Sequence, residues 1–117
     1  MELIIGGAYQ GKLTYAVKKY GFSKEDLFDL AEGLPGREYR CYYHLEALSR
    51  RGLSSAEILA LIPENAVVIS REIGAGIVPM DPAERLWREA HGAVLRALAE
   101  RADSVTRIFC GFAEVIK

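Results

Sequence analysis

The sequence predicts an α/β fold with a mainly parallel sheet covered by helices on both faces. Three observations predict it: short apolar runs alternate with helical patterns, a glycine-rich loop follows the first run, and the chain closes on two short apolar segments. With 117 residues, half of them hydrophobic, the chain fits one compact domain spanning residues 1–117.

The strands are expected where β-branched residues gather between turn signals. Leu3-Ile4-Ile5 ends on two glycines, and Ala66 to Ile69 places three β-branched residues together. Leu27 to Leu30 fits a third short strand, although Ser23 to Asp26 before it equally resembles a helix-capping box. Val105–Cys110 and 113–116 flank Gly111-Phe112, which predicts a C-terminal β-hairpin.

Helices are expected where apolar residues recur at intervals of three and four. The first begins at Leu13 and stops at Gly21, and the last begins at Asp81-Pro82 and runs to about Arg101. Between them, the same spacing predicts helices over residues 39–51 and 55–61.

Composition excludes several classes of partner. Fifteen basic and sixteen acidic residues give a net charge of −1, so no global field attracts nucleic acid or an anionic membrane. The opening apolar run is too short for a signal sequence or a membrane span. Cys41 and Cys110 lack the close spacing of zinc or disulfide sites, and we expect a reducing, cytoplasmic location.

The segment between the first strand and the first helix matches the phosphate-binding P-loop. Its spacing is glycine, any four residues, glycine, lysine. In such loops, backbone N–H groups and the helix N-terminus face phosphate oxygens, and the lysine bridges the terminal phosphates. The predicted nucleotide-binding residues are Gly6, Gly7, Ala8, Tyr9, Gln10, Gly11, Lys12, Leu13 and Thr14.

One position departs from the P-loop pattern. Leu13 stands where a serine or threonine hydroxyl normally helps to hold magnesium, so whether Mg²⁺ accompanies the nucleotide stays open. Thr14 is adjacent, but one helical step turns a side chain by about 100°. The alternative is a glycine-rich turn that packs strand against helix and binds nothing.

A second motif carries a resemblance to a known family. Residues 70–79 read Ser-Arg-Glu-Ile-Gly-Ala-Gly-Ile-Val-Pro. Together with Ile5 to Ala8 and Gly11-Lys12, they resemble the adenosylcobinamide kinase and adenosylcobinamide-phosphate guanylyltransferase family, whose pattern is Thr-Asn-Glu-Val-Gly-x-Gly-Ile-Val-Pro. The resemblance covers the first twenty and about the last fifty residues, so the chain looks like a shortened, divergent member.

The resemblance implies a P-loop NTPase-like three-layer fold and a role in cobalamin biosynthesis. It implies GTP or ATP as the bound nucleotide, adenosylcobinamide or its phosphate as the second substrate, and self-association into an oligomer. A non-catalytic nucleotide-binding module is the alternative. In the family a histidine takes GMP covalently, and His44 is the only histidine in the central region; a partly buried histidine beside two tyrosines is the alternative reading.

Four further residues are candidates for the site. Glu72 is the preferred acid, because the carboxyl end of a central strand faces the ligand crevice of open α/β sheets. A capping or salt-bridging role for the glycine loop that follows is the alternative. Asp29 could hold magnesium through water, or be a solvated strand-end aspartate. Arg85 and Arg88 fall at family positions and either contact phosphate or form surface ion pairs. His91 stands where the family usually has a small residue, and we expect it to be structural or on the surface.

Overall fold

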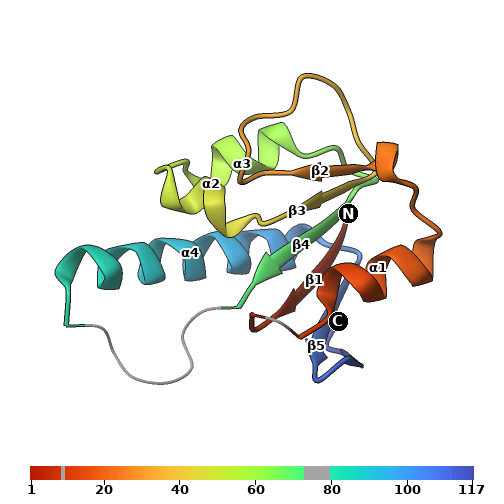
Figure 1. Ribbon diagram of the computed structural model, residues 1–117. Helices are drawn as coiled ribbons and strands as arrows, with labels where there is room; N and C mark the ends of the chain where they lie inside the picture. The colour runs from red at the N-terminus through yellow and green to blue at the C-terminus, as the bar shows by residue number, and fades with distance from the viewer. Residues whose placement is uncertain (9, 73–79) are drawn as a thin grey trace.

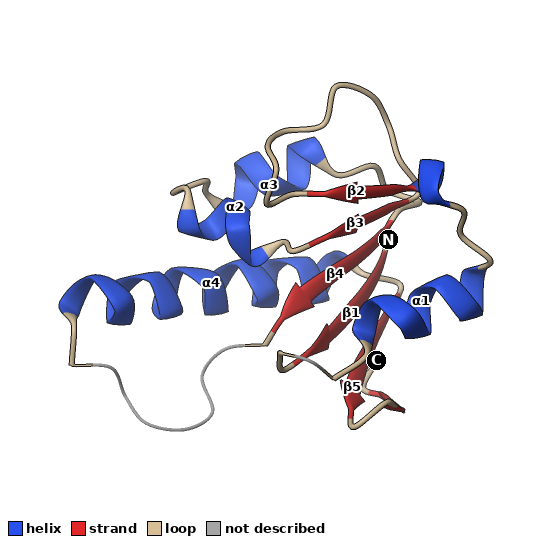
Figure 2. Cartoon of the chain, viewed as in Figure 1, coloured by secondary structure: helices blue, strands red, loops and turns tan. Residues whose placement is uncertain are grey.

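The computed structural model describes residues 1–8, 10–72 and 80–117, and it shows a mixed α/β fold (Figures 1 and 2). A six-stranded sheet has the order β2-β3-β4-β1-β5-β6, parallel throughout except for β6, which pairs antiparallel with β5. The strands are β1 Glu2–Gly6, β2 Leu27–Asp29, β3 Cys41–Tyr43, β4 Val67–Arg71, β5 Ser104–Phe109 and β6 Phe112–Val115. The helices are α1 Lys12–Tyr20, α2 Glu46–Arg50, α3 Ser55–Leu61 and α4 Pro82–Arg101.

The three expected layers follow from alternation along the strands. Ile4 and Ile69 pack on the α1 side, in one buried cluster with Ala16 of that helix. Leu3 and Val68 point the other way, into a second buried cluster that the helices α2, α3 and α4 supply. Figure 2 shows α1 on one face of the sheet and these three helices on the other. This is the P-loop-like three-layer architecture that the sequence predicts.

Most predicted elements are confirmed, with local stop signals where expected. Helix α1 ends at Gly21, whose left-handed φ of 68° closes the helix with a bond from its N–H to the Val17 carbonyl. Helix α4 begins after Asp81, whose carboxylate accepts from the Ala83 N–H. Residues 23–29 satisfy both interpretations, since a capped 3₁₀ turn at Lys24–Asp26 leads directly into β2.

The helix predicted over residues 39–51 is wrong in its first half. Residues 41–43 form β3, between β2 and β4, and only 46–50 are helical. Cys41 and Tyr42 are both buried, on opposite sides of the sheet. The apolar spacing was compatible with a helix, but pairing with two neighbouring strands satisfies the backbone groups of this segment.

The predicted C-terminal hairpin is confirmed, with Cys110 and Gly111 at its turn, both at positive φ. None of the helices described here combines the length and apolar character needed to cross a membrane. The glycines and proline of 74–79 lie outside the described residues.

Candidate functional site

The glycine-rich loop leads directly into the N-terminus of α1. Gly11 adopts a left-handed φ of 89°, which turns the chain so that α1 begins at Lys12. Lys12 folds back over the loop, and its Nζ donates to the Gly7 carbonyl oxygen at 2.6 Å. Gly6 packs so closely on β5 that a Cβ there would lie 2.6 Å from the Ile108 carbonyl oxygen. Close packing, rather than chain reversal, therefore requires the first glycine.

A cavity of about 410 Å³ opens beside this loop, at the carboxyl ends of β3 and β4. The loop and the start of α1 form one wall, and the residues that follow β3 and end β4 form the other. Its lining residues are Ala8, Gln10, Gly11, Lys12, Leu13, Thr14, Tyr43, His44, Glu46, Ile69 and Arg71. The fold thus brings six of the eight described loop residues predicted to bind nucleotide together with His44. Tyr9, also predicted, lies outside the described residues.

Two cations and one carboxylate set the electrostatics of this cavity. Burial lowers the pKa of Lys12; the negative charge of Glu46 opposes this shift and the positive charge of Arg71 adds to it. Glu46 also accepts a hydrogen bond from the backbone N–H of Arg71 at 2.9 Å. A phosphate entering the cavity would stabilise the charged form of the lysine, because it would bring negative charge next to it.

His44 lies in the loop between β3 and α2, not in a helix as the sequence suggested. Its φ of 61° is left-handed, and its Nδ1 lies 2.7 Å from Oδ1 of Asp29. Asp29 ends β2 and pairs in register with Tyr43, the last residue of β3. Two candidates identified separately in the sequence are therefore direct neighbours. The ring nitrogen Nε2 makes no hydrogen bond with any residue that the structure describes.

The other predicted side chains lie elsewhere. Glu72 forms an ion pair with Arg107 at 2.8 Å, and Arg107 lies beside Ile5, which packs on the α4 side of the sheet. The backbone of Glu72 still touches the loop, because its N–H donates to the Gly6 carbonyl at 2.7 Å. Neither Arg85 nor Arg88 lines the cavity beside the loop. Roles for these three residues stay predictions.

The hairpin turn supports the loop from its other side. The N–H of Cys110 donates to the side-chain Oε1 of Gln10 at 2.6 Å, and the N–H of Gly111 donates to the backbone carbonyl oxygen of Gln10 at 3.0 Å. Next to this contact, a second cavity of about 550 Å³ runs along α1. Gly11 and Thr14 line both cavities, so the two open on either side of the start of α1.

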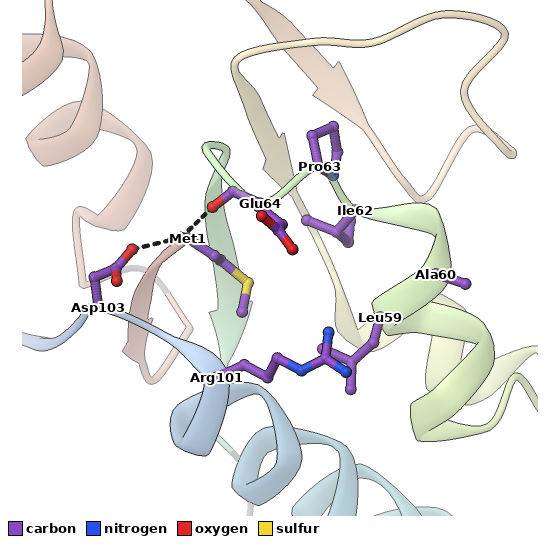
Figure 3. A pocket seen from close by; sticks show the side chains of 8 residues that line it. All are labelled: Met1, Leu59, Ala60, Ile62, Pro63, Glu64, Arg101 and Asp103. Carbon is purple, nitrogen blue, oxygen red and sulfur yellow. Dashed lines mark hydrogen bonds and ion pairs between the residues drawn. The ribbon is translucent and has the colours of Figure 1, made fainter.

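A third cavity, of about 450 Å³, lies far from these residues, at the amino ends of the strands (Figure 3). The N-terminal ammonium of Met1 is bonded there to Asp103 at 2.8 Å and to the Glu64 carbonyl. Open parallel sheets bind ligands at the carboxyl ends of their strands, so this cavity is the weaker candidate.

Metal-ligating side chains do not cluster in the part of the chain that the structure describes. No group of three or more histidine, cysteine, aspartate or glutamate side chains gathers within ligand distance in the described ranges. Asp29 is engaged by His44 and by the Ala31 N–H, and its role as a metal ligand stays a prediction. Leu13 packs partly against the apolar cluster on the α1 side. Thr14 is exposed and lines the cavity, although helical rotation separates it from the usual ligand position.

Sequence reasoning missed Arg71 and gave Glu46 no role of its own. The signal for Arg71 was available, because it continues the alternating series Val67, Ile69 on the α1 side of β4. Glu46 could not be placed while residues 39–51 were interpreted as one helix.

Comparison with known families adds an independent observation. The family described as cobinamide kinase / cobinamide phosphate guanyltransferase matches residues 39–116 of the 117-residue chain. The match includes His44, Glu46, Arg71, Glu72 and the C-terminal hairpin, and it begins after the glycine-rich loop. The search of curated proteins gave no match.

Proposed function

The chain belongs to the cobinamide kinase / cobinamide phosphate guanyltransferase family, and from this premise we propose a specific activity within cobalamin biosynthesis. Residues 1–117 act as one nucleotide-binding domain that holds GTP or ATP on the loop from Gly6 to Thr14. The domain then transfers part of that nucleotide to adenosylcobinamide or its phosphate.

Nucleotide binding is supported by the local geometry of the loop. Backbone N–H groups at the start of α1 and the Lys12 ammonium face a cavity large enough for phosphate groups. The Lys12 ammonium already donates a hydrogen bond to the Gly7 carbonyl oxygen, and phosphate oxygens would replace that acceptor.

Nucleotidyl transfer is the step that the site supports best, and one observation carries it: His44 lines the same cavity as Lys12, and its Nδ1 is paired with the Asp29 carboxylate. With the proton on Nδ1 held by the carboxylate, Nε2 carries a lone pair. That lone pair attacks the α-phosphorus of the triphosphate, an N–P bond forms, and pyrophosphate leaves. An oxygen of adenosylcobinamide phosphate then attacks the same phosphorus, and the N–P bond breaks to regenerate the histidine.

The kinase reaction is the second member of the proposal and uses the same loop. There, the terminal hydroxyl of adenosylcobinamide attacks the γ-phosphorus and the nucleoside diphosphate leaves, while Lys12 neutralises charge on the transferred group. Neither step assigns a role to Glu72, Arg85 or Arg88.

The test uses the purified chain with GTP or ATP labelled at the α- or γ-phosphate. We expect an acid-labile adduct from the α-labelled nucleotide, its loss in His44→Ala, and loss of nucleotide binding in Lys12→Ala. The matched control is Arg101→Ala, which removes an exposed side chain at the distant cavity of Figure 3 and should keep the adduct. An absent adduct together with absent phosphoryl transfer would exclude both activities.

The alternative, a module that binds nucleotide without turnover, is favoured by one specific observation: Leu13 offers no hydroxyl to a metal. It predicts nucleotide-dependent thermal stabilisation with neither adduct nor product. Measuring binding with and without magnesium, in the native chain and in Leu13→Thr, separates the two. Binding that ignores magnesium in the native chain and responds to it in the variant would show that Leu13 removes the metal requirement.

A further inference from the structure

Arg71 occupies the position on β4 that faces the glycine-rich loop. Val67 and Ile69 of the same strand pack on the α1 side of the sheet, and alternation gives Arg71 that side as well. Its side chain is exposed and lines the cavity that also contains Lys12 and His44. The positive charge of Arg71 also lowers the pKa of Lys12, as expected for two cations that line one cavity. Paired cations in one cavity favour a ligand with more than one negative charge.

Hydrogen bonds hold both backbone groups of Arg71, its N–H and its carbonyl oxygen. Its N–H donates to Oε1 of Glu46 at 2.9 Å. Its carbonyl oxygen accepts from Nε2 of His91 at 3.0 Å and from the Ser70 hydroxyl at 3.2 Å. These contacts come from α2, α4 and β4, so three elements determine where the arginine side chain begins.

His91 is fully buried, with no exposed surface. Its Nδ1 lies 2.8 Å from the Ser49 hydroxyl, and its ring stacks on Trp87 with 21° between the planes. The Arg71 carbonyl oxygen can only accept, so Nε2 carries the proton that it donates there, and the neutral ring accepts at Nδ1 from the Ser49 hydroxyl. The ring therefore has one orientation and one tautomer.

We propose that Arg71 is a second phosphate-binding residue beside Lys12, and that His91 is the positioning residue that holds it at the cavity. This inference rests on the proposed nucleotide site and adds to it a residue that favours triphosphates over monophosphates. Arginine suits this role because its planar guanidinium can contact two phosphate oxygens at once. The family pattern has asparagine at position 71 and usually a small residue at 91, so Arg71 and His91 both depart from that pattern.

The experiment compares dissociation constants for a nucleoside triphosphate and its monophosphate by calorimetry. In Arg71→Ala we expect triphosphate binding to weaken about ten- to one-hundredfold, with monophosphate binding changed much less. Arg71→Lys should lie between, since it keeps the charge and loses the two-pronged contact. The matched control is Arg101→Ala, which removes an exposed arginine at the cavity of Figure 3 and should leave both constants unchanged.

The role of His91 is tested through Arg71. His91→Ala should weaken triphosphate binding in the native background and have no further effect in Arg71→Ala. His91→Gln, whose amide can donate to the same carbonyl, should restore part of the affinity. If His91→Ala does not fold, Ser49→Ala tests the same arrangement by freeing Nδ1 of the ring. If His91→Ala or Ser49→Ala weakens triphosphate binding equally in the native chain and in Arg71→Ala, the positioning role is overturned.

The outcomes separate this inference from the proposed function. If neither nucleotide binds the native chain, the nucleotide site itself is wrong, and the inference falls with it. If Lys12→Ala abolishes binding while Arg71→Ala binds triphosphate as the native chain does, the proposed function stands and the inference alone is overturned.

Discussion

The Asp29 carboxylate and the His44 imidazole meet at 2.7 Å, at the carboxyl ends of neighbouring parallel strands. The aspartate side chain is 20% exposed and the histidine side chain 51%, so the carboxylate is the more sheltered partner. An imidazole held this way presents its other nitrogen in a fixed direction. The pair therefore supports the nucleophilic role that we propose for His44.

Replacing the carboxylate tests the pair directly. In Asp29→Asn we expect adduct formation on His44 to fall about a hundredfold, because the amide no longer stabilises the charge that develops on the ring. Nucleotide affinity should stay unchanged, since the aspartate does not line the cavity. Rapid-quench measurements with α-labelled nucleotide give the rate, and Glu32→Gln, in the loop after β2, is the control. Equal rates in Asp29→Asn and in the native chain would contradict the role of the pair.

Two glycine substitutions should change stability in opposite directions. Gly6→Ala should lower stability by about 1–3 kcal/mol, because its Cβ would meet the Ile108 backbone oxygen at 2.6 Å. Gly92→Ala, within α4, should raise stability by about 0.5–1 kcal/mol, since only the flexible end of Arg96 lies near the new methyl group. Urea unfolding followed by circular dichroism measures both. A Gly6→Ala variant as stable as the native chain would contradict the close packing of β1 on β5.

The buried His91 predicts a loss of stability in mild acid. Burial lowers its pKa below the ordinary value of 6.5, so the unfolded chain takes up a proton more readily than the folded chain. Its contribution is complete above about pH 6.5 and is lost as the pH falls, at up to about 1.4 kcal/mol per unit. The Arg71 carbonyl oxygen of β4, which accepts from the ring, and the negative charge of Glu46 of α2 both oppose this lowering.

Unfolding free energies measured between pH 7.5 and pH 5 test this expectation. His91→Gln should flatten the dependence in that window, while the native chain should lose stability toward pH 5. Carboxylates such as Glu2 and Glu57, whose pKa values are lowered by hydrogen bonds, contribute mainly below that range. The same slope in the native chain and in His91→Gln would show that another group is responsible.

The two thiols should differ strongly in reactivity. Cys41 is fully buried, and burial raises its pKa to about 12, whereas Cys110 is exposed at the hairpin turn. A thiol reagent at neutral pH should label Cys110 quickly and Cys41 only on unfolding, because the thiolate is the reactive form. Mass spectrometry after brief labelling identifies the site, and Cys110→Ser should remove the fast reaction. Rapid labelling of Cys41 in the folded chain would contradict its burial.

Local signals explain which elements could be predicted. The capping residues of α4, the glycine after α1 and the β-branched run of β4 each fix an element through neighbours a few residues away. Residues 39–51 carried no such unambiguous signal, since their apolar spacing suits a helix and a short strand alike. Only pairing with β2 and β4 made residues 41–43 a strand.

The sequence by itself determined the α/β fold, the glycine-rich loop and the family to which the chain belongs. The tertiary structure alone decided that Asp29 meets His44, that Arg71 shares a cavity with Lys12, and that Glu72 turns to Arg107 instead. The reason is physical. Loop and helix signals act between residues close in sequence, whereas a site at the carboxyl ends of a sheet depends on strand order, which joins residues far apart in the chain.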